Sequence, residues 1–140
     1  MNSIEIFASL WFLGFLINIP WEFLHSRLYT TCRNQTWREN VPLLITMSFK
    51  DGFFISLFYM VLSFSFGVRD ITRTPLVFIL FIFLALAFSF FDEQISIRKK
   101  RWEYAPEMPT VFGVGVTPLF EIAATGAAAI FILFRIFLVP

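Results

Sequence analysis

The stretch "PLVFILFIFLALAFSFF", residues 75–91, decides the fold. It contains no charged residue, and Ser89 is its only polar side chain. At a rise of 1.5 Å per residue, a helix of this length is close to the shortest that crosses a bilayer. Strands of a membrane β-barrel alternate apolar and polar residues, and this run does not alternate. Because backbone amides in hydrocarbon must be paired within their own segment, the stretch predicts a transmembrane helix.

The composition of the whole chain also indicates a protein that is surrounded by lipid. Of 140 residues, 58% are hydrophobic, 21 are Phe, and only 15% are charged. Soluble domains are about one quarter charged, and a chain of this size has too much surface to hide so many aromatic rings from water. The net charge of +1 gives no basic field that would attract nucleic acid. Lipid is therefore the expected solvent, and no nucleic-acid partner is expected.

Three further apolar segments accompany residues 75–91, at about residues 4–24, 52–68 and 117–139. The segment "VPLLITMSF", residues 41–49, is too short to span a bilayer. It is interpreted either as a short interfacial helix or as the lead-in to the second span. The fold predicted for residues 1–140 is a single all-α integral membrane domain, a bundle of four transmembrane helices.

The distribution of Lys and Arg predicts the orientation of this bundle. Loops that face the cytoplasm carry an excess of these residues. Loops 25–51 and 92–116 carry eight of the eleven, so we expect both to be cytoplasmic, with both termini outside a bacterial inner membrane. The eight residues are Arg27, Arg33, Arg38, Lys50, Arg98, Lys99, Lys100 and Arg101.

Polar side chains gather at the predicted cytoplasmic ends of the spans. Asn18, Glu22 and His25 are four and three positions apart, a spacing that places them on one helix face. Glu121 lies just inside the last span. An ionisable group in the apolar zone costs about 2.5–3.5 kcal/mol on insertion scales, so it usually faces a cavity or a partner. Two interpretations stay open: structural pairing of these groups, or a site where a desolvated carboxyl donates a proton near neutral pH.

Other acids lie at the remaining helix ends. Asp51, directly before Gly52, is interpreted as the N-cap of the second span. Asp92 and Glu93 stand at the predicted exit of the third span, where solvation at the interface is the alternative to a functional role. With one His and one Cys in the chain, no His/Cys metal cluster is expected. An all-carboxylate magnesium site is conceivable, but its spacing is not that of a diphosphate motif, and neither metal nor cofactor is predicted.

One pattern of spacings links the last two spans. Glu93 precedes Trp102 by nine positions, and Trp102 begins the element "WEYAP". Pro118 follows the proline of that element by twelve positions, and Glu121 follows Pro118 by three. Over about residues 90–122, this pattern resembles the membrane domain of the carotenoid lycopene cyclases of the bacterial heterodimeric and fungal fused type.

The resemblance implies proton-initiated chemistry on a polyisoprenoid without a cofactor. In that case Glu93 and Glu121 are the candidate acid and carbocation-stabilising groups, and Trp102 and Tyr104 are aromatic walls. Phe120 occupies the position where the family usually has an additional acid. Aromatic faces can stabilise cations, which agrees with this expectation.

Three function hypotheses follow from these observations. The first is an isomerase or cyclase acting on an isoprenoid or another membrane lipid. The second is a non-catalytic lipid-binding or assembly subunit of a membrane complex, and the third is a proton-coupled carrier that works as an oligomer. Whether the chain forms a homo-oligomer or a hetero-oligomer stays open. The candidate catalytic residues are Glu22, His25, Glu93 and Glu121, and the candidate substrate-binding residues are Asn18, Asp92, Trp102, Tyr104 and Pro118.

Overall fold

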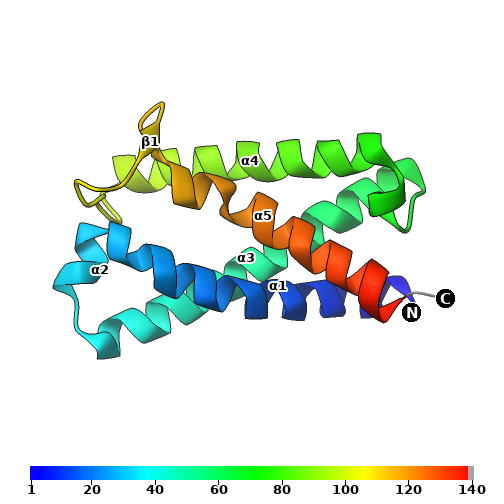
Figure 1. Ribbon diagram of the computed structural model, residues 1–140, viewed down its shortest axis with the longest axis horizontal. Helices are drawn as coiled ribbons and strands as arrows, with labels where there is room; N and C mark the ends of the chain where they lie inside the picture. The colour runs from blue at the N-terminus through cyan, green and yellow to red at the C-terminus, as the bar shows by residue number, and fades with distance from the viewer. Residues whose placement is uncertain (139–140) are drawn as a thin grey trace.

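Four long helices run along most of the length of the molecule (Figure 1), in a computed structural model that describes residues 1–138. Val139, the last residue of the predicted fourth span, and Pro140 lie outside the described residues. The elements are α1 (Ser3–His25), η1 (Ser26–Leu28), α2 (Thr30–Asn34), α3 (Trp37–Phe66), η2 (Ile71–Arg73), α4 (Pro75–Arg98), β1 (Thr110–Val111), β2 (Val114–Gly115), α5 (Val116–Ile132) and η3 (Leu133–Phe137).

The predicted fold class is confirmed. Four helical segments are long and apolar enough to cross a bilayer, namely Ser3–Leu28, Trp37–Phe66, Pro75–Arg98 and Val116–Phe137. The only strands among the described residues are β1 and β2, which form a two-residue antiparallel pair. The protein is therefore an all-α integral membrane protein built as a four-helix bundle.

Helix α3 begins much earlier than the predicted start at residue 52. Thr36 and Glu39 form a capping box, in which Glu39 Oε2 accepts hydrogen bonds from the amide and the hydroxyl of Thr36. Residues 41–49 belong to the first part of this continuous helix. They are therefore the lead-in to the second span, and they do not form a separate interfacial helix. The interpretation of Asp51 as an N-cap is wrong, because Asp51 lies buried in the middle of α3. Hydropathy alone could not detect a helix start made of polar residues.

Helix α4 also extends beyond its predicted end, to Arg98. Asp92 and Glu93 consequently lie inside the helix and not at its exit. The chain leaves α4 through Lys100, which has a left-handed φ of 53°. Phe112 and Gly113, both with positive φ, then make the tight turn between β1 and β2, which suits a two-residue hairpin.

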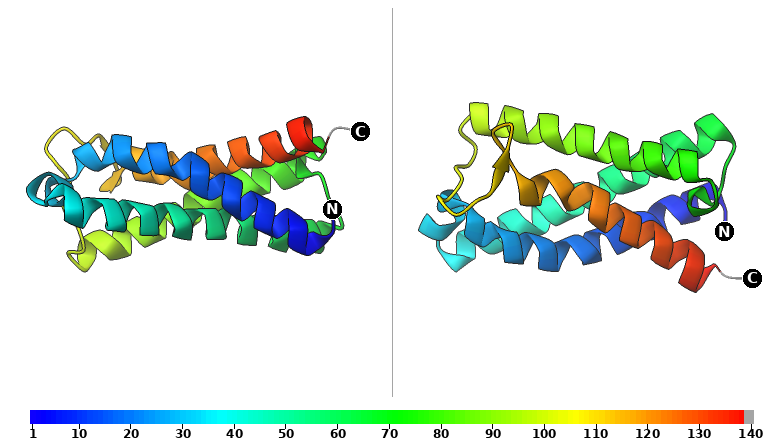
Figure 2. Two further views of the ribbon diagram at one scale, coloured as in Figure 1. Left: turned by 90° about the horizontal axis from the view of Figure 1, so that it is seen from below. Right: turned by 45° about the horizontal axis from the view of Figure 1, so that its top comes forward.

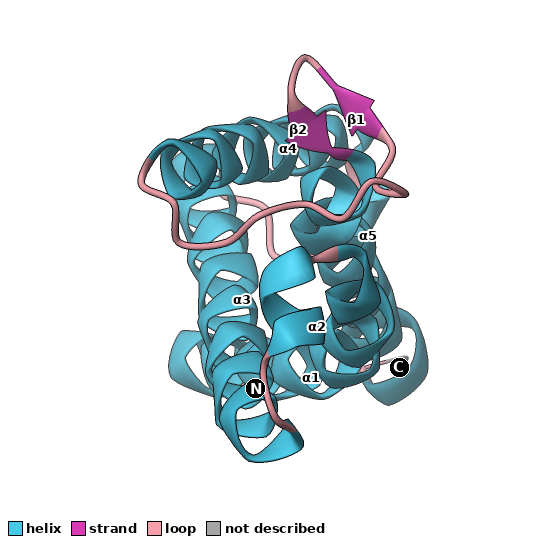
Figure 3. Cartoon of the chain, turned by 90° about the vertical axis from the view of Figure 1, so that its left-hand side faces the viewer, coloured by secondary structure: helices cyan, strands magenta, loops and turns pink. Residues whose placement is uncertain are grey.

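The chain order divides the bundle into two ends. Figures 1 and 2 show the N-terminus, the described end of α5 and the α3–α4 connection at one end. The connections 26–36 and 99–115 lie together at the opposite end, where Figure 3 shows the longer one crossing over the helix ends. We refer to this as the loop end of the bundle. It contains the residues that form the candidate site.

Helices α1 and α3 pack closely against each other at Gly14 and Gly52. A Cβ added to Gly14 would lie 3.0 Å from the Cα of Gly52. A Cβ added to Gly52 would lie 2.6 Å from the carbonyl oxygen of Trp11 and 2.7 Å from the amide nitrogen of Phe15. Small residues let helix backbones approach in this way inside a membrane. Gly126 of α5 packs closely in a similar way, because a Cβ added there would lie 2.7 Å from Cζ of Phe81.

We predict that Gly52→Ala lowers the free energy of unfolding in detergent by about 1–3 kcal/mol, a typical cost of overpacking. Helix propensity alone would give the opposite sign, because Ala is favoured over Gly by about 1 kcal/mol in a helix. The measurement is thermal unfolding followed by far-UV circular dichroism. Ser65→Ala, at an exposed position on the same helix, is the control. A Gly52→Ala protein as stable as the wild type would contradict the close crossing.

Candidate functional site

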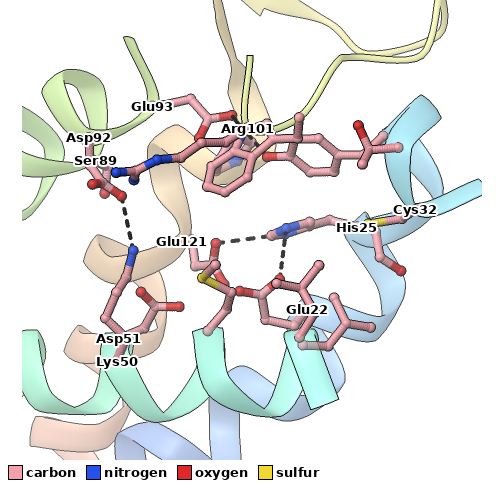
Figure 4. Close-up of a pocket in the computed structure, with 18 of the residues that line it drawn as sticks. Glu22, His25, Cys32, Lys50, Asp51, Ser89, Asp92, Glu93, Arg101 and Glu121 are labelled. Carbon is pink, nitrogen blue, oxygen red and sulfur yellow. Dashed lines mark hydrogen bonds and ion pairs between the residues drawn. The ribbon is translucent and has the colours of Figure 1, made fainter. Parts of the chain in front are cut away.

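A cavity of about 370 Å³ lies at the loop end, between the four long helices (Figure 4). Each of these helices contributes at least one carboxyl group to its lining, although carboxyl groups are normally kept out of a membrane interior. Such a concentration of acids in one buried space requires compensating groups or bound protons. The five acids are Glu22, Asp51, Asp92, Glu93 and Glu121.

Two of these acids flank the single histidine. Glu22 and His25 lie one turn apart on α1, with 3.2 Å between Glu22 Oε2 and His25 Nε2. Glu121, in the second turn of α5, places its Oε2 3.8 Å from His25 Nδ1. All three residues are at least 93% buried. His25 Nδ1 and Glu121 Oε1 have no hydrogen-bond partner among residues 1–138. We call Glu22, His25 and Glu121 the acid–histidine triad.

Glu93 has a different environment, because three side chains donate hydrogen bonds to its Oε1. The donors are Tyr29 Oη at 3.0 Å, Trp102 Nε1 at 3.1 Å and Tyr104 Oη at 2.7 Å. Tyr104 Oη in turn accepts from the amide of Gly115 at 2.8 Å. An ionised carboxylate accepts only, and several donors on one oxygen stabilise its charge. Glu93 therefore ties the connection 99–115 to α4.

Both tyrosines at Glu93 are held in the donor form. Burial raises the pKa of Tyr29 well above its ordinary value, and the neighbouring Glu93 carboxylate raises it further. Burial is also the main cause of the raised pKa of Tyr104, with a further contribution from Glu93. A hydroxyl that keeps its proton can donate to the carboxylate at every physiological pH.

Backbone bonds join the two connections at the loop end. Tyr29 and Tyr104 form an isolated antiparallel bridge. The amide of Thr30 donates to the carbonyl of Glu103 at 2.9 Å, and the amide of Ala105 donates to the carbonyl of Leu28 at 2.8 Å. The element "WEYAP" is thus paired with the chain that follows α1, and it contributes Trp102 to the cavity lining.

The charges of the cavity are only partly balanced by basic groups. Lys50 Nζ lies 3.0 Å from Asp92 Oδ2, and both side chains are about one third exposed. Arg101 lines the cavity as well and donates to the hydroxyl of Ser96. Within the described part of the chain, no Lys or Arg forms an ion pair with Glu22, Asp51 or Glu121. Bound protons or a cation are therefore needed to neutralise the negative charge of these three carboxyls.

The structure brings most of the sequence-predicted site residues to this one cavity. Asn18 lies deeper in α1, where its Nδ2 donates to the carbonyl of Gly14 at 2.8 Å, and it is not part of the lining. Tyr104 stands behind Glu93 and also lies outside the lining. The predicted residues that line the cavity are Glu22, His25, Asp92, Glu93, Trp102, Pro118 and Glu121.

Several lining residues were not among the predicted site residues. Lys50 and Asp51 belong to the cavity because α3 starts at Trp37, and the Thr36–Glu39 capping pattern is the sequence signal that could have revealed it. Tyr29 gave no such signal, since its role depends on pairing with a distant loop.

Cys32, the only cysteine of the chain, lines the same cavity and is partly buried. Burial raises the pKa of its thiol, and the nearby Glu22 raises it further. Because the thiolate is the reactive form, we predict slower alkylation by iodoacetamide at pH 7 than for an exposed thiol. The rate should climb only as the pH approaches the raised pKa. Mass spectrometry of the alkylated protein measures it.

The control for this prediction is Asn34→Cys in a Cys32→Ser background, which places a thiol at an exposed position two residues away. Equal alkylation rates and equal pH profiles for the two thiols would contradict the partly buried position of Cys32 in the cavity lining.

The fold and the cavity define a class of protein: a small four-helix membrane protein with an acid-rich cavity at its loop end. Comparisons of the chain with protein-family models, with curated proteins and with solved structures found no match. The function of this chain is therefore inferred from the geometry of the site.

Proposed function

We propose that this protein is an isomerase or cyclase that acts on an isoprenoid or another unsaturated membrane lipid and starts its reaction by protonation. The observation that carries this proposal is the meeting of Glu22, Glu93 and Glu121, from three different helices, at one cavity where all three side chains are buried. Glu93, Trp102 and Glu121 are also the residues that carry the resemblance to membrane lycopene cyclases, and their shared cavity supports it.

Glu121 is the proposed proton donor. Its Oε1 is buried without a hydrogen-bond partner in the described chain, and its other oxygen faces His25. Protonation of a carbon–carbon double bond by the Glu121 carboxyl would leave a carbocation on the substrate and a carboxylate on the protein. Loss of a proton from a neighbouring carbon to the triad then forms a new double bond and restores the starting charge. His25, which lies beside both Glu22 and Glu121, would pass this proton back to Glu121 before the next turnover.

Glu93 is proposed as a positioning residue. Its oxygen Oε1 is already occupied by three donors, so its main effect is to hold Trp102 at the cavity wall. The indole and the ring of Phe88 line the cavity, where aromatic faces can stabilise a cation. We therefore assign the role of the acid to Glu121 and not to Glu93.

The dimensions of the cavity suit one end of a lipid chain. About 370 Å³ lies within the range of small-ligand pockets, which is roughly 300–1,000 Å³. A longer isoprenoid would extend from the cavity into the surrounding bilayer. From the Lys and Arg distribution, we place the loop end at the cytoplasmic face of a bacterial inner membrane, with both termini outside.

Lipid extraction and mass spectrometry of the purified protein test this proposal. We expect one class of isoprenoid or unsaturated lipid to be retained by the wild type. Ser89→Phe should reduce this retention, because Ser89 is buried in the cavity wall and the larger ring fills the space. Ser65→Phe adds the same ring at an exposed site on α3 and should leave retention unchanged.

Equal retention by the wild type and Ser89→Phe, with both proteins folded by circular dichroism, would contradict lipid binding in this cavity. Retention of a lipid that the protein never converts would favour the alternative of a non-catalytic lipid-binding subunit.

A further inference from the structure

We infer that the acid–histidine triad is also a binding site for one divalent transition-metal ion, with Zn²⁺ as its best representative. This inference goes beyond the proposed function, which assigns only protons to these residues. A bound ion would displace the proton from Glu121, so the metal-bound state and the proton-donating state exclude each other. It rests on three separate observations: the geometry of the triad, its unpartnered buried atoms, and the charge around it.

The three side chains of the triad lie close enough together to surround one ion. Glu22, His25 and Glu121 each offer one ligand atom, and these atoms lie within 4.8 Å of one another. Tetrahedral coordination with bonds of about 2.0 Å needs ligand atoms about 3.3 Å apart. The ligand atoms would therefore have to move closer together when an ion binds. Two of the ligands lie one turn apart on α1 and the third lies on the adjacent α5.

Unpartnered atoms point to a ligand at the same place. His25 Nδ1 and Glu121 Oε1 are buried without a hydrogen-bond partner in the described chain, on residues that are 93% and 94% buried. Figure 4 shows His25 lying between the carboxyls of Glu22 and Glu121 at the cavity. Buried polar atoms in folded proteins are normally paired with protein or solvent, and these two are free to accept a ligand.

The charge around the triad favours a cation. Asp51 is a third buried carboxyl on the same cavity, and no Lys or Arg of residues 1–138 is paired with any of the three acids. A divalent ion would neutralise two negative charges that are otherwise costly to bury.

The donor set indicates which ion. Mg²⁺ prefers oxygen ligands alone and octahedral geometry, whereas an imidazole with carboxylates suits Zn²⁺ and its transition-metal neighbours. Three protein ligands leave a fourth position open toward the cavity, as in zinc sites that bind water or substrate. No metal site was predicted from the sequence, because a His/Cys cluster and an all-carboxylate site were considered but not one histidine combined with carboxylates from two helices.

Metal binding can be measured on the full-length protein in detergent after treatment with a chelator. We expect isothermal titration with Zn²⁺ to give one ion per chain, and Co²⁺ to give the visible absorption of a low-coordinate site with a nitrogen ligand. Glu22→Gln, His25→Gln and Glu121→Gln should each weaken zinc binding at least tenfold. Glu103→Gln is the matched control, because Glu103 is an exposed acid at the same end of the bundle and lies outside the cavity lining. Its zinc affinity should stay within about twofold of the wild type.

Absence of stoichiometric zinc binding to the folded wild type would overturn the inference. Zinc binding that survives all three triad substitutions would overturn it as well, since the ion would then be held elsewhere. If a triad variant fails to fold, the stoichiometry of zinc binding and the cobalt spectrum of the wild type still show whether the metal site exists. Zinc binding and lipid retention are measured separately. A protein that retains no lipid but binds zinc would contradict only the proposed function, and a protein that retains lipid but binds no zinc would contradict only the metal site.

Discussion

Replacing Glu121 with Gln is expected to slow conversion of the retained lipid by about 10²–10⁴-fold, the usual contribution of a general acid. Gln has the same shape and keeps a carbonyl oxygen beside His25, but it has no proton to transfer. The hydrogen bond from Thr125 Oγ1 goes to the backbone carbonyl of residue 121 and survives the change. The measurement is chromatography with mass spectrometry of lipids from membranes that contain each variant.

Glu103→Gln is the control for this experiment, because Glu103 is an exposed acid in the nearby connection. It should convert lipid at the wild-type rate. If Glu121→Gln were as active as the wild type, Glu121 would not be the proton donor. If it failed to insert or fold instead, the residue would have a structural role.

Glu93→Leu is expected to produce the largest loss of stability among the cavity substitutions, about 3–5 kcal/mol. The change removes the acceptor of three hydrogen bonds and leaves the hydroxyls of Tyr29 and Tyr104 and the indole N–H of Trp102 unpaired. Each unpaired buried donor costs roughly 1–3 kcal/mol. Thermal unfolding in detergent measures this loss, and limited proteolysis should show earlier cleavage within residues 99–115.

Two further substitutions distinguish the loss of the three hydrogen bonds to Glu93 from the loss of a negative charge. Glu93→Gln keeps one acceptor oxygen and should lose clearly less stability than Glu93→Leu. Glu103→Leu removes an exposed carboxyl and should change the unfolding free energy by no more than about 0.5 kcal/mol. An unfolding midpoint of Glu93→Leu equal to that of the wild type would contradict the anchoring role of Glu93.

Hydropathy was sufficient to predict the four helices, because the apolar runs are long and contain few charges. It failed at the ends of α3 and α4, where charged residues continue the helix beyond the apolar run. Lys50 and Asp51 interrupt the apolar pattern, yet they face a polar cavity instead of lipid, so the helix continues through them. Hydropathy scales treat such residues as the end of a span.

The candidate site could be predicted only where its members share a helix. The helical period relates Glu22 to His25, but the contact between His25 and Glu121 depends on how α1 and α5 pack. The bonds from Tyr29 and Tyr104 to Glu93 depend on the backbone pairing of two distant connections. Such contacts between elements have no periodic signature in one sequence.

Incorporation of solvent deuterium tests the central claim most directly. Membranes containing the protein are incubated in D₂O, and the lipids are then extracted and compared by mass spectrometry with those from Glu121→Gln membranes. Protonation of a double bond followed by loss of a different proton predicts one deuterium in a single isoprenoid or unsaturated lipid, formed only with the wild type. A lipid product without deuterium, or equal labelling with Glu121→Gln, would contradict proton-initiated chemistry in this cavity.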